Sequence, residues 1–209
     1  LGLAYVASAL RAAGHDVAVI DAHGAGLEQY VTRSGMRVRG LSDSQILERI
    51  PRDAELVGFG CMFSALWPVV RDLAKQVHEA LPRARLVLGG EHGTGAPEMS
   101  LAQAPLSAVV MGEGEETIVA LASALEHRTP LEDVAGIAFR NGAVHVNPAR
   151  ARITAIDEIH WPAWDLFDLE AYIRVGPPHG AARGRFVPMP ATRGGPYQCT
   201  FCTSPQRWT

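Results

Sequence analysis

The chain has 209 residues, 47% of them hydrophobic and 20% charged, a composition typical of a folded globular protein. Lys and Arg number 19 and Asp and Glu 22, a net charge of −3, so no basic excess indicates a nucleic-acid or anionic-membrane partner. No apolar run approaches the roughly 18 residues that span a bilayer, and we expect a cytoplasmic location.

Short apolar runs alternate with helical patterns along the first 125 residues. The predicted helices are residues 1–14, a helix capped at Ser42, a helix that follows Ser64, and residues 115–125. The predicted strands are residues 17–20, 55–60, 85–88 and 107–111. This alternation predicts an α/β fold, with a parallel sheet covered by helices on both faces.

The segment that follows differs in pattern. Residues 137–139 and 144–146 flank Asn141-Gly142, a dipeptide typical of a tight hairpin turn. Prolines then punctuate a stretch with little periodicity. We therefore expect one domain over 1–126, a hairpin and linker over 127–184, and the start of another domain over 185–209. Because the chain begins inside a helical pattern and ends abruptly, we also expect it to be an internal fragment.

Glycines gather in the loops that follow the predicted strands, at 21–26, 60–64, 89–95 and 112–114. Loops at the carboxyl ends of parallel strands carry the ligand site, and glycine allows a ligand to approach the backbone closely. The G-x-G-x-x-G dinucleotide fingerprint and the Walker A motif are both absent, which disfavours an ordinary NAD or NTP domain. The candidate cofactor-binding residues of these loops are Gly60, Ser64, Gly89, Gly90, Glu91, Gly112, Glu113 and Gly114.

Three cysteines in 209 residues make no disulfide scaffold, but Cys199 and Cys202 lie three residues apart near the C-terminal end. The stretch from Arg193 to Cys202 resembles the cluster loop of radical S-adenosylmethionine (SAM) enzymes, whose pattern is Cys-x3-Cys-x2-Cys. The resemblance implies Cys199 and Cys202 as ligands of a [4Fe–4S] cluster that binds SAM, with Phe201 near the adenine side. Gly195 stands where the family has its first cysteine.

Other segments resemble the cobalamin (B12)-binding domain that precedes many radical SAM domains. They include Gly14-His15-Asp16-Val17, Gly89-Gly90-Glu91-His92, the stretch from Gly112 to Thr117, and the linker around Trp161 and Trp164. The resemblance implies a Rossmann-like, flavodoxin-like domain that holds cobalamin against a partial (β/α) barrel, whose first strand and cysteine loop would lie in 185–209. It also implies a strand before Leu1.

Asp21-Ala22-His23-Gly24-Ala25-Gly26 spells D-x-H-x-x-G, which supplies the histidine beneath the cobalt in many cobalamin-binding domains. There the motif follows the first strand, whereas here it follows the second. We interpret the match as coincidental, with no protein histidine beneath the cobalt. The resemblance to the cobalamin-binding family also implies that His92 lies near the corrin tail. Cys61 follows a buried strand, and we expect it in the hydrophobic core of the domain.

The resemblance implies the N-terminal part of a cobalamin-dependent radical SAM enzyme that performs methyl transfer to an unactivated carbon or a cyclisation, inactive as a fragment. Its partners would be a small-molecule substrate and an electron donor. One alternative is a corrinoid-binding module without radical chemistry, because Gly195 replaces a cluster cysteine. Another is a zinc half-site at Cys199 and Cys202, completed by ligands outside the chain.

Overall fold

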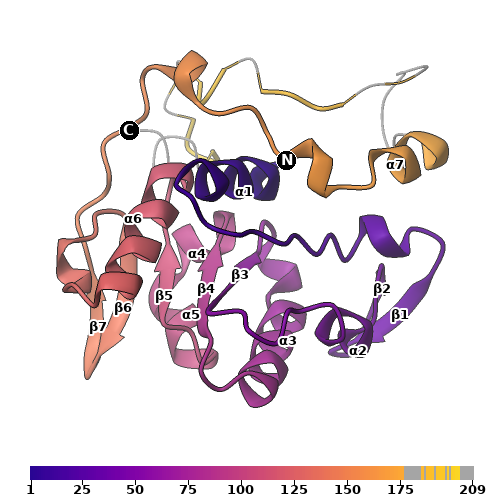
Figure 1. The fold of residues 1–209 in the computed structure, drawn as a ribbon, viewed down its shortest axis with the longest axis horizontal. Helices are drawn as coiled ribbons and strands as arrows, with labels where there is room; N and C mark the ends of the chain where they lie inside the picture. The colour runs from indigo at the N-terminus through magenta and orange to yellow at the C-terminus, as the bar shows by residue number, and fades with distance from the viewer. Residues whose placement is uncertain (177–184, 186, 191, 196, 198, 203–209) are drawn as a thin grey trace.

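A computed structural model describes residues 1–176, 185, 187–190, 192–195, 197 and 199–202. Its centre is a five-stranded sheet in the order β3-β4-β5-β6-β7 (Figure 1). The strands are β3 (Leu56–Gly60), β4 (Arg85–Gly89), β5 (Ala108–Val110), β6 (Ile137–Asn141) and β7 (Ala143–Val146). The first three run parallel, as the alternating pattern predicted, whereas β6 and β7 are antiparallel. The predicted hairpin is therefore confirmed, and it extends the same sheet.

Helices cover both faces of this sheet, as predicted. On one face α1 (Gly2–Ala12) and α6 (Glu115–His127) lie side by side, and Val87, Val110 and Leu121 are buried between strands and helices (Figure 1). On the other face α3 (Trp67–Ala80) packs with Leu86 and Leu88. The two cores follow from the apolar character of the central strands, whose alternate side chains point to opposite faces.

Two short helices cover the second face beside α3. They are α2 (Asp43–Leu47) and α5 (Pro97–Gln103), and α4 (Glu91–Gly95) precedes α5 directly. Ser42 caps α2 as predicted, in a reciprocal capping box in which Ser42 Oγ accepts from Gln45 N at 3.3 Å. Neither α4 nor α5 was predicted, and in α4 two glycines among five residues give a weak helix signal.

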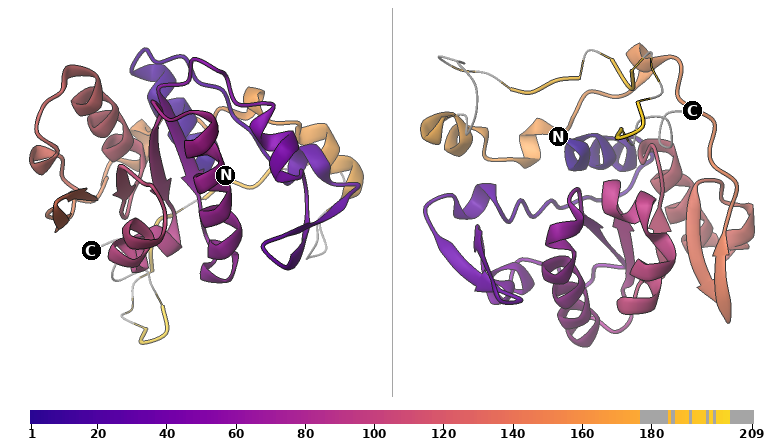
Figure 2. Two further views of the ribbon diagram at one scale, coloured as in Figure 1. Left: turned by 90° about the horizontal axis from the view of Figure 1, so that it is seen from below. Right: turned by 180° about the vertical axis from the view of Figure 1, so that it is seen from behind.

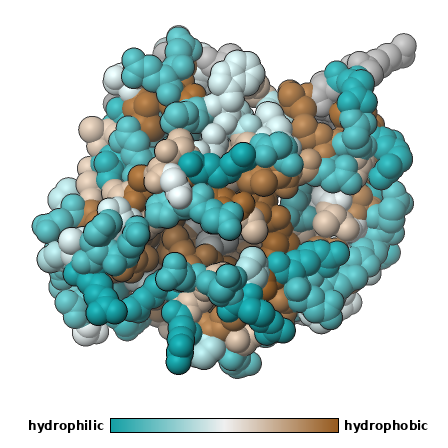
Figure 3. Space-filling model, in the orientation of Figure 1, coloured by the Kyte–Doolittle hydropathy of each residue, from teal (hydrophilic) through white to brown (hydrophobic). Residues whose placement is uncertain are grey.

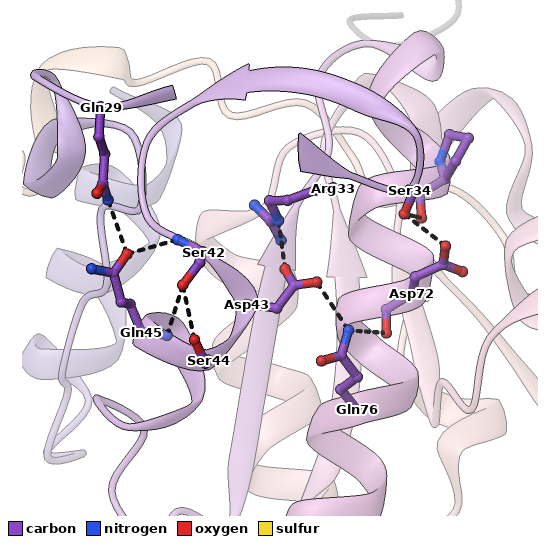
Figure 4. Close-up of polar contacts among 10 residues, drawn as sticks. Gln29, Arg33, Ser34, Ser42, Asp43, Ser44, Gln45, Asp72 and Gln76 are labelled. Atoms are coloured by element: carbon purple, nitrogen blue, oxygen red, sulfur yellow. Dashed lines mark hydrogen bonds and ion pairs between the residues drawn. The ribbon is translucent and has the colours of Figure 1, made fainter. Parts of the chain in front are cut away.

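A two-stranded hairpin, β1 (Tyr30–Arg33) and β2 (Met36–Arg39), stands apart from the central sheet. Figure 4 shows how polar side chains attach it to α2 and α3. Asp43 accepts from Arg33 Nε at 2.5 Å and from Gln76 Nε2 at 2.9 Å, while Ser34 Oγ donates to Asp72 at 2.7 Å. These contacts fix the position of a hairpin too small to be stable alone.

The predicted strand at 17–20 is wrong, because residues 15–20 form no regular element. Within the described residues β3 pairs only with β4, and residues 17–20 do not pair with its free edge, so they lack the hydrogen-bonded ladder of a strand. Ile20 and Ala22 nevertheless pack against the core that includes α2 and α3.

After β7 the chain crosses over the outer side of α1 and continues to α7 (Leu169–Val175), the last helix among the described residues, as Figures 1 and 2 show. Ala163 N donates to Ala4 O at 3.0 Å, and Arg11 pairs with Asp165 at 2.7 Å. Figure 3 shows a mostly polar surface in the same view, interrupted by a central band of apolar residues. Residues 187–190 form no strand, and the partial barrel stays a prediction.

Candidate functional site at the carboxyl edge of the sheet

The loops that follow β3 and β4 are joined by backbone hydrogen bonds. Gly60 and Gly89 are register partners at the carboxyl ends of their strands. Beyond them, Cys61 N donates to Gly89 O at 2.9 Å and His92 N donates to Cys61 O at 3.1 Å. The backbone of both loops is therefore fixed at one edge of the sheet.

Gly90 occupies the tightest point of this junction. Its φ is +99° and its ψ −177°, a conformation essentially restricted to glycine. A Cβ at this position would lie 2.6 Å from Cys61 O and 3.0 Å from Cys61 C. Only a residue without a side chain allows the two loops to approach this closely.

Thr94 joins the loop after β5 to the same edge. Its Oγ1 donates to Gly90 O at 3.1 Å and accepts from Gly112 N at 3.0 Å. Gly112 has a φ of +69°, so it also adopts a glycine conformation. The structure thus brings together three of the four predicted loops, and Gly60, Gly89, Gly90 and Gly112 lie along one edge, whereas the predicted loop at 21–26 lies elsewhere.

His92 lies beneath these loops as a buried polar group. Its ring stacks on Trp67 at a centroid distance of 4.8 Å, and its Nδ1 lies 2.9 Å from Ser64 Oγ. Trp67 is held in turn by a hydrogen bond from Nε1 to Gln103 Oε1 at 2.7 Å. Burial lowers the pKa of His92, which favours its neutral form. Its Nε2 is buried with no hydrogen-bond partner in the described part of the chain, which is costly unless a ligand or water supplies one.

Apolar side chains project from the loop after β3. Met62 is 61% exposed and Phe63 62%, and Leu66 at the end of the next turn is also exposed. Leu3 of α1 lies next to the start of this loop, 3.4 Å from the position of a Cβ on Gly60. This apolar rim, formed by Met62, Phe63 and Leu66, was not predicted from the sequence. Its signal was a run of large apolar residues in a loop where polar residues are usual.

Glu113 and Gly114 lie where β5 leads into α6. The carboxylate of Glu113 accepts from Ile153 N at 2.7 Å and from Arg193 Nη1 at 2.8 Å, so both oxygens have donors from the chain itself. Glu115 also bonds Arg193, and Glu116 lies 3.6 Å from Arg150. Burial lowers the pKa of Arg193, but its hydrogen bonds to Glu115 and Glu113 outweigh this, and the net shift is upward. A cofactor contact by Glu113, or by Glu91 at the start of α4, stays a prediction.

Cys199 and Cys202 share one turn, in which Cys202 N donates to Cys199 O at 3.0 Å. Both are half-buried, and Phe201 is fully exposed. Among the described residues no group of three or more Cys, His, Asp or Glu side chains is arranged to hold a metal ion. Cys61 is buried elsewhere, and burial raises the pKa of its thiol to about 11. Two thiolates and Gly195 do not fit a [4Fe–4S] cluster, which needs a third protein ligand.

The D-x-H-x-x-G segment lies outside this edge cluster, in the turn η1 (Gly24–Gly26) next to α7. Asp21 accepts from Gly24 N at 3.0 Å and from the Tyr172 hydroxyl at 2.7 Å, and His23 Nδ1 lies 3.2 Å from Arg39 O. These contacts give the motif a structural role. An open depression of about 360 Å³ lies nearby, lined by residues of η1, α2 and α7.

Comparisons with known proteins agree with this architecture. An uncharacterized methyltransferase of Pyrococcus horikoshii is 34% identical over 98% of this chain and 40% of its own length. An anaerobic magnesium-protoporphyrin IX monomethyl ester cyclase of Synechocystis is 30% identical over all of this chain and 38% of its own length. The chain therefore spans about two fifths of these relatives.

Among solved structures, the radical SAM methyltransferase TsrM of Kitasatospora setae matches 70% of this chain and 27% of its own, with a TM-score of 0.53 and 16% identity. This likeness shows a shared fold. In the described residues no helix has both the length and the apolar character needed to cross a membrane. The B12-binding domain model matches residues 1–122, more than half of the chain. The chain therefore belongs to the B12-binding domain family, and its relatives include proteins named as a methyltransferase and as a magnesium-protoporphyrin IX monomethyl ester cyclase.

Proposed function

We propose that the carboxyl edge of β3, β4 and β5 binds a corrinoid, and that the chain is the N-terminal part of a cobalamin-dependent radical SAM enzyme. The observation that carries the proposal is the convergence of three glycine-containing loops at one edge, beside the exposed apolar rim of Met62, Phe63 and Leu66. Methyl transfer to an unactivated carbon or a related cyclisation is the proposed reaction class, with an electron donor and a small-molecule substrate as partners.

The residues present at this edge fit a corrinoid, a broad and largely apolar macrocycle rimmed by amide groups. Gly60 is exposed and Gly89 and Gly112 are partly exposed, so their backbone allows close approach, while Phe63 and Met62 offer apolar surface. The unpartnered Nε2 of His92 offers a buried polar atom that an amide of the cofactor would satisfy. When bound, cobalamin supplies a cobalt centre that carries a methyl group. The chain's own residues bind the cofactor, orient it and exclude water.

Gly195, in the place of the first cluster cysteine, favours a second candidate function. With Cys199 and Cys202 as the two thiols of the loop, the chain would act as a corrinoid-binding module without radical chemistry. A zinc half-site at the same cysteines would need ligands from outside the described residues.

Titration with aquocobalamin, followed by its absorbance spectrum, tests the proposal. We expect binding of one corrinoid per chain, and Phe63→Asp should weaken it about tenfold or more by removing apolar contact. Tyr30→Asp is the matched control, because Tyr30 is an equally exposed aromatic residue on the separate hairpin. His23→Ala should leave the spectrum of the bound cobalt unchanged. Absence of binding, or equal loss from Phe63→Asp and Tyr30→Asp, would contradict the proposed site.

A further inference from the structure

Arg193 is held between two carboxylates at the carboxyl edge of the sheet. Its Nη1 donates to Glu113 at 2.8 Å and its Nη2 donates to Glu115. The side chain of Arg193 is 9% exposed, that of Glu113 6% and that of Glu115 12%. This is a buried ion-pair cluster, formed by residues about 80 positions apart in the sequence.

Further contacts fix both the side chain and the backbone of Arg193, and also the Glu113 carboxylate. The Cζ of Arg193 lies 5.6 Å from the centre of the Tyr5 ring on α1. Arg193 O accepts from Arg152 Nη2 at 2.6 Å, and the amide of the next residue, Ile153, donates to the other oxygen of Glu113. The segment that contains Arg152 and the segment that contains Arg193 therefore meet at the same carboxylate.

A second ion pair of the same C-terminal segment is exposed, in contrast to the buried pairs of Arg193. Arg185 pairs with Glu170 of α7, but these side chains are 70% and 62% exposed. Exposed pairs contribute little to holding a chain in place, because water competes for both charges. Removing one member of a buried pair leaves the other charge buried and uncompensated, so loss of Arg193 disturbs its surroundings more than loss of Arg185. The anchor of this segment is thus at Arg193 rather than at Arg185.

We propose that Glu113 and Glu115 form a clamp that positions the cysteine loop through Arg193. Cys199 follows Arg193 by six residues, which span at most about 22 Å when fully extended. Fixing Arg193 beside the loop after β5 therefore keeps Cys199 and Cys202 near the edge formed by Gly60, Gly89 and Gly112. Glu113, Glu115 and Arg193 are positioning residues, and their use to bring the loop near a corrinoid rests on the proposed function.

Distances between spin labels test the clamp directly. The labels are placed on Cys199 and on Glu79→Cys, an exposed position of α3, in the full chain with Cys61→Ala and Cys202→Ser. We expect a narrow distance distribution in this chain. Arg193→Ala should widen it about twofold, because the segment becomes a flexible tether. Arg193→Lys should give an intermediate width, since a lysine cannot bridge both carboxylates in the same way. Arg185→Ala is the matched control and should leave the width unchanged.

The paired change Glu113→Gln and Glu115→Gln keeps the shape of the clamp, removes its charge and should also widen the distribution. This double variant tests the clamp if the Arg193→Ala chain fails to fold. Unchanged widths in folded Arg193→Ala or in the glutamine pair would overturn the proposal. The labels report without any corrinoid, so failure of the aquocobalamin titration would refute the proposed function and leave the clamp standing.

Discussion

Gly90→Ala perturbs the junction on which the candidate site depends. The glycine-only conformation at φ +99° and ψ −177° costs another residue about 1–3 kcal/mol. The new Cβ would meet three backbone atoms of Cys61, at 2.6, 3.0 and 3.2 Å, and relieving this overlap costs about 1–3 kcal/mol more. We therefore expect a loss of about 2–6 kcal/mol, a large part of the roughly 5–15 kcal/mol that stabilises a typical domain.

Urea unfolding followed by circular dichroism measures this loss. Gly95→Ala is the matched control, because Gly95 lies in the same connection, at the end of α4, has no positive φ and has no atom within 4 Å of its Cβ position. We expect Gly95→Ala to be neutral or up to about 1 kcal/mol more stable, since alanine favours a helix over glycine. A Gly90→Ala chain within about 0.5 kcal/mol of the unmodified one would refute the reasoning.

Three further predictions concern titration, thiol reactivity and iron. Because burial lowers the pKa of His92 below 6.5, the unfolded chain binds a proton there more readily. The contribution of His92 to the free energy of unfolding should therefore be complete above about pH 6.5. As the pH falls further, the free energy of unfolding should decrease by up to about 1.4 kcal/mol per pH unit. Urea unfolding measures this slope, and the same slope in a His92→Gln chain would contradict the prediction. Alkylation of the folded chain at neutral pH should modify Cys199 and Cys202 but not Cys61, because the pKa of the Cys61 thiol is raised to about 11. Cys61 should react only after urea unfolds the chain. Rapid modification of Cys61 in the folded chain, detected by mass spectrometry, would contradict this. Among the described residues no atom lies within 4 Å of a Cβ on Gly195, so in a longer chain that includes the whole cluster domain Gly195→Cys should raise bound iron toward about four per chain. About four irons already bound with Gly195 in place would show that another residue supplies the third ligand.

The central strands and main helices were predictable because their signals are local. Apolar runs at 55–60, 85–88 and 107–111 are too short and too buried to be surface helices, and α3 and α6 carry apolar residues at helical spacing. The segment 17–20 has the same composition but forms no strand, because a strand needs a hydrogen-bonded neighbour as well as a sequence pattern. The antiparallel pairing of β6 with β5 was likewise missed, since sequence does not reveal which strand a hairpin joins.

Only part of the candidate site was predictable from the sequence, and for the same reason. The convergence of the glycine loops followed from the rule that carboxyl ends of parallel strands share an edge. The ion pairs of Arg193 with Glu113 and Glu115 join residues about 80 positions apart, so no local sequence pattern predicts them. Glu115 lies in the first turn of α6, where an acid stabilises the helix dipole, and it also binds a buried guanidinium.

Hydrogen exchange of the full chain with and without aquocobalamin tests most directly whether the carboxyl edge of β3, β4 and β5 is the corrinoid site. Slower exchange on binding should be concentrated in residues 60–64, 89–95 and 112–114, with little change in the hairpin β1–β2. No protection at the edge, or protection confined to the depression between η1, α2 and α7, would contradict the account.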